Sequence, residues 1–68
     1  MDFTIEFEQE SDGRWIAEIP SLPGTMAYGK SRAQARALAQ ALALRVVAER
    51  LEHAEAESET LTITFRAA

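Results

Sequence analysis

The first nineteen residues alternate between apolar and polar positions, which is typical of strands that bury one face. The alternation predicts strands over residues 3–8 and 14–19, joined by a hairpin turn at residues 11–13 with Asp12-Gly13 as its core. The inward positions are Phe3, Ile5 and Phe7 in the first strand and Trp15, Ala17 and Ile19 in the second. Ile16 is the one large apolar residue on the polar face, either a scattered surface residue or part of a contact patch.

The connector over residues 20–31 holds both prolines and two of the three glycines. Leu22-Pro23-Gly24-Thr25 fits a type II turn, because proline pre-sets φ at the second position and glycine supplies the positive φ at the third. A short third strand follows over residues 25–28, with Met26 and Tyr28 expected on the apolar face. Ser31 and Gln34 then form a capping box at a helix start. The residues assigned to turns and cap are Asp12, Gly13, Pro20, Pro23, Gly24, Gly29, Ser31 and Gln34.

The same connector matches the P-loop pattern G-x-x-x-x-G-K-[ST] from Gly24 to Ser31. A P-loop needs a buried parallel strand that ends at the first glycine, and an acidic residue at a second strand end to help hold the metal. Pro23 occupies the place of that strand end, where proline cannot donate to a central ladder, and residues 61–65 carry no acid. Nucleotide or RNA binding, through Lys30 and the arginines at the helix start, is therefore a remote alternative.

A helix is predicted from about residue 32 to about residue 53, since this segment lacks glycine and proline and is rich in strong helix formers. Two apolar stripes run along it, one of which should pack on the sheet. The other either meets a partner or a symmetry mate, or reflects only the helix propensity of alanine. The stripes are Ala35, Leu38, Ala39, Leu42 and Val46, and Ala37, Ala41, Leu44, Ala48 and Leu51, with Val47 between them. Acidic residues near the helix end predict fraying from His53 onward.

Residues 61–65 predict a fourth strand, in which Leu61, Ile63 and Phe65 face the core. Strand–helix–strand connections are usually right-handed crossovers, and a meander precedes this one. The expected fold is therefore a single α+β domain over residues 1–68. Its elements run β-β-β-α-β, the sheet order is 3-2-1-4, the last strand is parallel to the first, and the helix lies on one face.

A chain of 68 residues buries only about 60% of its unfolded surface, so we expect a homo-oligomer, either a dimer or a tetramer. It has no cysteine and one histidine, which argues against disulfides, a metal site or a metal cofactor. No apolar run approaches the roughly 20 residues of a membrane span, and the acidic N-terminus is unlike a signal peptide. We therefore expect a soluble, cytoplasmic protein with no cofactor.

The net charge of −4 is unevenly distributed and argues against general nucleic-acid binding. Acidic residues dominate the segment before Pro20, whereas none falls between Glu18 and Glu49. The acids before Pro20 are Asp2, Glu6, Glu8, Glu10, Asp12 and Glu18, against one base, Arg14. This acidity either serves solubility or attracts a basic partner.

The order of these signals resembles the HicB-like antitoxin family over nearly the whole chain. The residues that carry the resemblance are Asp12-Gly13, Trp15, Ala17, Pro20, Leu22-Pro23-Gly24, Gly29, Ser31, Ala35 and Leu42. The resemblance implies a cut-down ribonuclease-H-like sheet with one helix. It also implies that the protein binds and silences HicA, a small basic toxin that cleaves mRNA. Many members add a C-terminal DNA-binding domain, but this sequence stops after the fourth strand, so we expect no direct DNA binding.

The expected function is thus neutralisation of a HicA-type toxin by protein–protein contact, with Glu6, Glu8, Asp12, Ile16 and Glu18 as candidate contact residues. The alternative is a solitary HicB-like oligomeric module without a toxin. Catalysis is not expected, because two-metal phosphoryl chemistry needs carboxylates that converge from several elements. The helix offers no acid before Glu49, and the last strand offers none.

Overall fold

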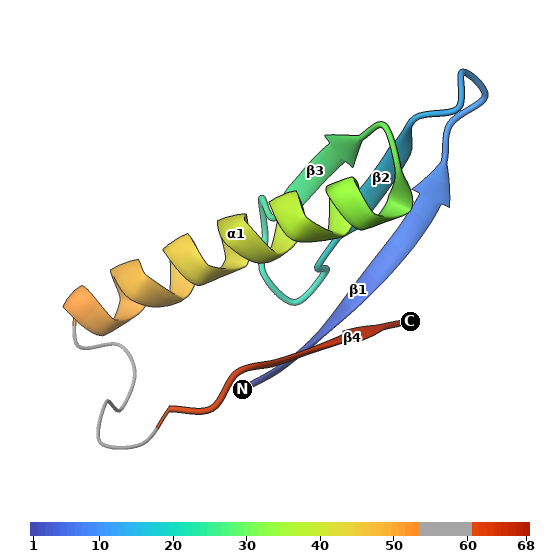
Figure 1. The fold of residues 1–68 in the computed structure, drawn as a ribbon. Helices are drawn as coiled ribbons and strands as arrows, with labels where there is room; N and C mark the ends of the chain where they lie inside the picture. Colours follow the sequence, from blue (N-terminus) through green and yellow to red (C-terminus); the bar gives the residue numbers. More distant parts are fainter. Residues whose placement is uncertain (54–60) are drawn as a thin grey trace.

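The alternating N-terminal segments form the middle of a four-stranded sheet in the computed structural model of the protein, which describes residues 1–53 and 61–68 (Figure 1). The sheet order is β3-β2-β1-β4. β1 pairs with β2, and β2 with β3, in antiparallel fashion, whereas β1 and β4 are parallel. The predicted α+β class, element order and sheet order are confirmed. The elements are β1 (Asp2–Gln9), β2 (Trp15–Glu18), β3 (Met26–Gly29), α1 (Arg32–Glu52) and β4 (Thr64–Ala67).

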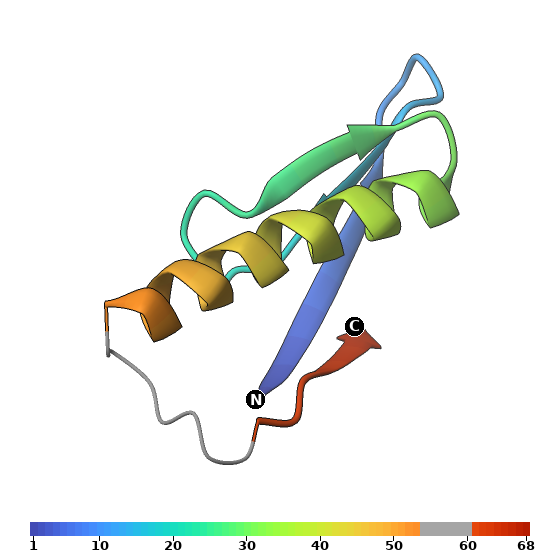
Figure 2. The ribbon, with the colours of Figure 1, turned by 60° about the vertical axis from the view of Figure 1, so that its left-hand side comes forward.

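The helix α1 lies on one face of the sheet, where it packs against β2 and β3 (Figure 2). Its buried residues recur every four positions and are small except for the last: Ala35, Ala39, Ala43 and Val47. The core continues through Phe3, Ile5, Ala17, Ile19 and Leu22. The helix bounds agree with the prediction, but the predicted stripes are wrong in detail. Ala43 belonged to neither stripe, and Leu38, assigned to one, is 45% exposed.

Strand β3 turns its large side chains away from the core, which corrects the sequence-based expectation. Met26 is paired with Glu18, and Tyr28 with Ile16, so both lie on the face opposite the helix and are more than 40% exposed. Ala27 is paired with Ala17 and packs against the core. The inward positions of this strand therefore hold small residues, because α1 passes too close for methionine or tyrosine.

The fourth strand begins later than predicted, since its pairing with β1 starts at Thr64, opposite Asp2. Ile63 and Phe65 pack against the core as expected, and the Phe65 ring lies 5.7 Å from the Phe3 ring. Leu61 precedes the strand and is 39% exposed, so its predicted core position is wrong. The fraying predicted beyond His53 concerns residues 54–60, which lie outside the described residues.

Gly13 and Gly24 have the positive φ that the predicted turns require. Gly24 has a φ of 84°, and the Thr25 N–H donates to the Leu22 carbonyl at 3.1 Å, as in a type II turn. Gly13 has a φ of 95° and closes the first hairpin by donating to the Glu10 carbonyl at 2.9 Å.

The helix start departs slightly from a standard capping box. Ser31 Oγ accepts from the Gln34 N–H at 3.1 Å, which confirms the cap. The Gln34 side-chain oxygen, however, accepts from the N–H of Lys30 at 2.6 Å, one residue before the cap. Both bonds fix the angle at which the chain leaves β3 and enters α1.

Of the three glycines, Gly29 is the one at which the sheet and the helix approach each other most closely. A Cβ atom at Gly29 would lie 2.4 Å from the backbone nitrogen of Ala35. We expect Gly29→Ala to lower the free energy of unfolding by about 1–3 kcal/mol, because the helix must move away from β3. Urea denaturation followed by circular dichroism measures the change.

Gly24→Asn is the matched control, because nothing lies within 4 Å of a Cβ atom at Gly24 and asparagine tolerates its positive φ. The control should lose less stability than Gly29→Ala. Equal stability of Gly29→Ala and the unmodified protein would contradict the close approach.

Candidate functional site

No described residue of the chain covers the face of the sheet that points away from α1 (Figure 2). We call it the open face. Strand alternation and pairing place the side chains of β1 to β3 on it in two rows. One row is Glu8, Ile16 and Tyr28, and the next is Glu6, Glu18 and Met26. Arg66 of β4 joins the same face beside Thr4.

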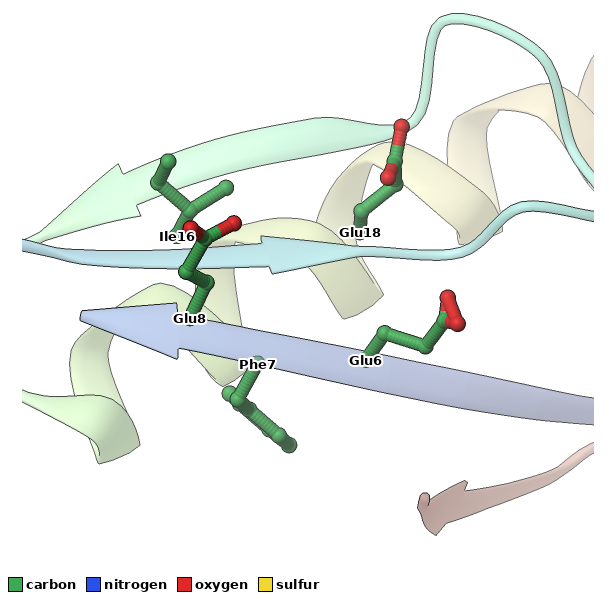
Figure 3. A pocket seen from close by; sticks show the side chains of 5 residues that line it. All are labelled: Glu6, Phe7, Glu8, Ile16 and Glu18. Atoms are coloured by element: carbon green, nitrogen blue, oxygen red, sulfur yellow. The ribbon is translucent and has the colours of Figure 1, made fainter. Parts of the chain in front are cut away.

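Three glutamates on the open face, Glu6, Glu8 and Glu18, form what we call the acidic patch. Glu6 is directly opposite Glu18 on the neighbouring strand, and Glu8 is opposite Ile16. These residues line a shallow depression, together with Phe7 (Figure 3). Phe7 itself packs against the core, and the Arg32 guanidinium lies 3.9 Å from its ring centre. The structure thus brings together four of the five candidate contact residues.

The acidic patch is not neutralised by the described part of the chain. The ion pairs among the described residues join Arg14 to Asp12 and Arg66 to Asp2, and neither includes a residue of the acidic patch. Like charges directly opposite each other on neighbouring strands destabilise a sheet. Glu6 and Glu18 occupy such opposite positions, although their side chains point in different directions (Figure 3), and a cationic partner would neutralise both charges.

Asp12, the fifth candidate, lies in the hairpin turn and is already engaged. Its carboxylate accepts from the Arg14 N–H at 3.0 Å and from Arg14 Nε at 2.8 Å. The bond from the Arg14 backbone is the main reason that the pKa of Asp12 lies below its ordinary value of 3.8. We therefore interpret Asp12 first as a turn residue that positions Arg14.

Met26 and Tyr28 are open-face residues that sequence reasoning missed. The Arg14 guanidinium lies 4.9 Å from the centre of the Tyr28 ring, so the turn and β3 are linked across the open face. The signal that could have found them is the alternation of small residues at Thr25, Ala27 and Gly29, which suits the side facing an alanine-rich helix.

The connector does not have the shape of a phosphate-binding loop. Gly24 precedes strand β3 and Gly29 ends it, so an extended strand separates the two glycines of the pattern. The Ser31 hydroxyl accepts the cap hydrogen bond from Gln34 rather than lying free for a metal.

Among residues 1–53 and 61–68, no group of three acidic, histidine or cysteine side chains is placed to hold a metal ion. No helix in the same residues is long and apolar enough to cross a membrane.

Removal of one charge from the Glu6–Glu18 pair should stabilise the free protein. We expect Glu18→Gln to raise the free energy of unfolding by about 0.2–1 kcal/mol at low salt, and the gain to shrink as added salt screens the repulsion. Urea titrations at two ionic strengths measure both effects. Glu8→Gln is the control, because Glu8 is opposite Ile16 and should gain less. A loss of stability in Glu18→Gln would show that the pair is not repulsive.

Comparison of the chain with protein-family models, with curated proteins and with solved structures found no match. The likeness to HicB-like antitoxins therefore rests on the sequence pattern alone.

Proposed function

We propose that this protein is a binding module of the antitoxin type, which neutralises a small basic HicA-type toxin by direct contact through the open face. The observation that carries the proposal is the acidic patch of Glu6, Glu8 and Glu18, which lies on an uncovered sheet face and is left without ion pairs by the described residues. The HicB-like order of sequence signals supports the same function.

The charge of the patch suits a partner that handles RNA. A protein that cleaves mRNA must attract phosphates, and it does so with basic side chains. The patch attracts the same basic surface, so the two proteins associate faster than neutral ones, and the complex keeps RNA away from that surface. In this proposal the protein acts by occupying its partner, and it needs neither a catalytic residue nor a cofactor.

Co-expression with a small basic HicA-like protein encoded beside the gene tests this function. We expect the antitoxin to relieve growth arrest and the two proteins to elute together on gel filtration. Glu6→Gln/Glu18→Gln should slow association by about tenfold or more at low salt, because it removes two of the steering charges. Glu49→Gln/Glu52→Gln, on the exposed end of α1, removes equal charge and should leave the rate unchanged.

The proposal fails if growth arrest persists and no complex forms. A complex whose association rate is the same in both double variants would also count against it, since the acidic patch would then have no part in attraction.

Self-association is the second part of the proposal, and it also applies if the module works without a toxin. The buried helix side chains are mostly alanine, whereas Leu38 and Leu44 are 45% and 47% exposed on α1. A small domain gains stability when such side chains are covered by a second copy. We expect a dimer or a tetramer by sedimentation equilibrium at about 10 μM, weakened in Leu38→Gln/Leu44→Gln. A mass equal to one chain at that concentration would contradict the prediction.

A further inference from the structure

The open face is divided into a charged side and an apolar side. In both rows, a glutamate of β1 lies at one end and a large apolar side chain of β3 lies at the other. The two ends are Glu8 and Tyr28 in one row, and Glu6 and Met26 in the next. Ile16 and Glu18 of β2 lie between them, one apolar and one acidic, so β2 is the boundary between the two sides.

The apolar side is exposed although its residues are large. Met26 is 45% exposed and Tyr28 is 43% exposed, and both border the free edge of the sheet at β3. Arg14 holds one side of the Tyr28 ring, while Ile16, half-buried beside it, extends the apolar surface toward β1. Exposure of apolar side chains to water is unfavourable, so a partner that covers them gains binding free energy.

We propose that the open face receives an amphipathic helix of its protein partner, lying along β2, with basic residues on the flank over β1 and apolar residues on the flank over β3. This inference rests on the proposed function and specifies the part of the partner that is bound. The charge of the acidic patch selects the basic flank, and Met26 and Tyr28 select the apolar flank.

The dimensions of a sheet and a helix agree with this arrangement. Neighbouring strands are about 4.8 Å apart, so β1 and β3 are separated by about 10 Å. A helix with its side chains is about 10–12 Å wide and therefore spans from the acidic patch to Met26 and Tyr28. Along each strand, successive outward residues are about 6.7 Å apart, close to the 6 Å between helix positions i and i+4. One flank of such a helix can thus meet both rows.

Other classes of partner use only part of this face. RNA and anionic membranes present phosphates, which the acidic patch repels. A small cation would satisfy the glutamates but leave Met26 and Tyr28 uncovered. A helix with both a basic and an apolar flank is complementary to the whole surface.

Two synthetic peptides of about 18 residues and identical composition test the inference directly. The first places lysines at i, i+4 spacing on one flank and leucines on the other, and the second distributes the same residues evenly around the helix. We expect the first to bind the full-length protein about tenfold more tightly or better, to gain helical circular dichroism on binding, and to shift amide NMR signals of β1, β2 and β3. Equal affinities, or binding without helix formation, would overturn the inference.

Variants of the protein separate the two sides of the face. Met26→Thr and Tyr28→Thr should each lower the affinity for the first peptide by about tenfold, and Glu6→Gln/Glu18→Gln should lower it equally. Leu61→Gln is the apolar control, since Leu61 is 39% exposed but precedes β4, and Glu49→Gln/Glu52→Gln is the charge control. Neither control should alter affinity, and circular dichroism verifies that each variant is folded.

The results distinguish this inference from the proposed function. If the toxin binds through the glutamates and both threonine variants retain full affinity, the amphipathic-helix inference fails and the toxin-binding function stands. If the first peptide binds as expected but no toxin forms a complex, the toxin-binding function fails and the inference stands.

Discussion

The close packing of an alanine-rich helix on β2 and β3 is the constraint on which the rest of this structure depends. Gly29 has no room for even a Cβ atom against Ala35, and Ala17 and Ala27 are paired beneath the helix. Small side chains on both layers bring the layers together and leave no space for larger ones. The large residues of β3 must therefore point to the other side of the sheet.

This constraint also determines the character of the open face. If Met26 and Tyr28 pointed inward, the outer side of β3 would carry Thr25, Ala27 and Gly29 and would offer little to a partner. Because they point outward, the same face combines apolar area with the glutamates of β1 and β2. The packing on one side of the sheet thus creates the binding properties that we infer for the other.

Strand alternation was sufficient to predict most of the fold but not the orientation of β3. In β1, apolar and charged residues alternate, so only one assignment of faces is possible. In β3, methionine, alanine and tyrosine are all apolar, and the period of two cannot decide which of them faces the core. The decision comes from the helix above, and the helix was itself ambiguous because alanine occurs on nearly every side of it. The first residue of β4 is determined by its pairing with β1, and the sequence of residues 61–65 alone does not reveal where that pairing begins.

The acidic patch followed from the sequence because β1 alternates clearly and a short turn fixes the register of β2 against it. Its apolar neighbours did not, since they depend on the orientation of β3. The charge pairing of the acidic patch also bears on its function. Glu6 lies directly opposite Glu18, while Arg14 and Arg66 pair with other acids. Residues that lower the stability of the free protein are common where a partner is bound, because binding supplies the missing interaction. The acidic patch, which has no ion pair among the described residues, is therefore the physical argument that the open face is completed by another molecule.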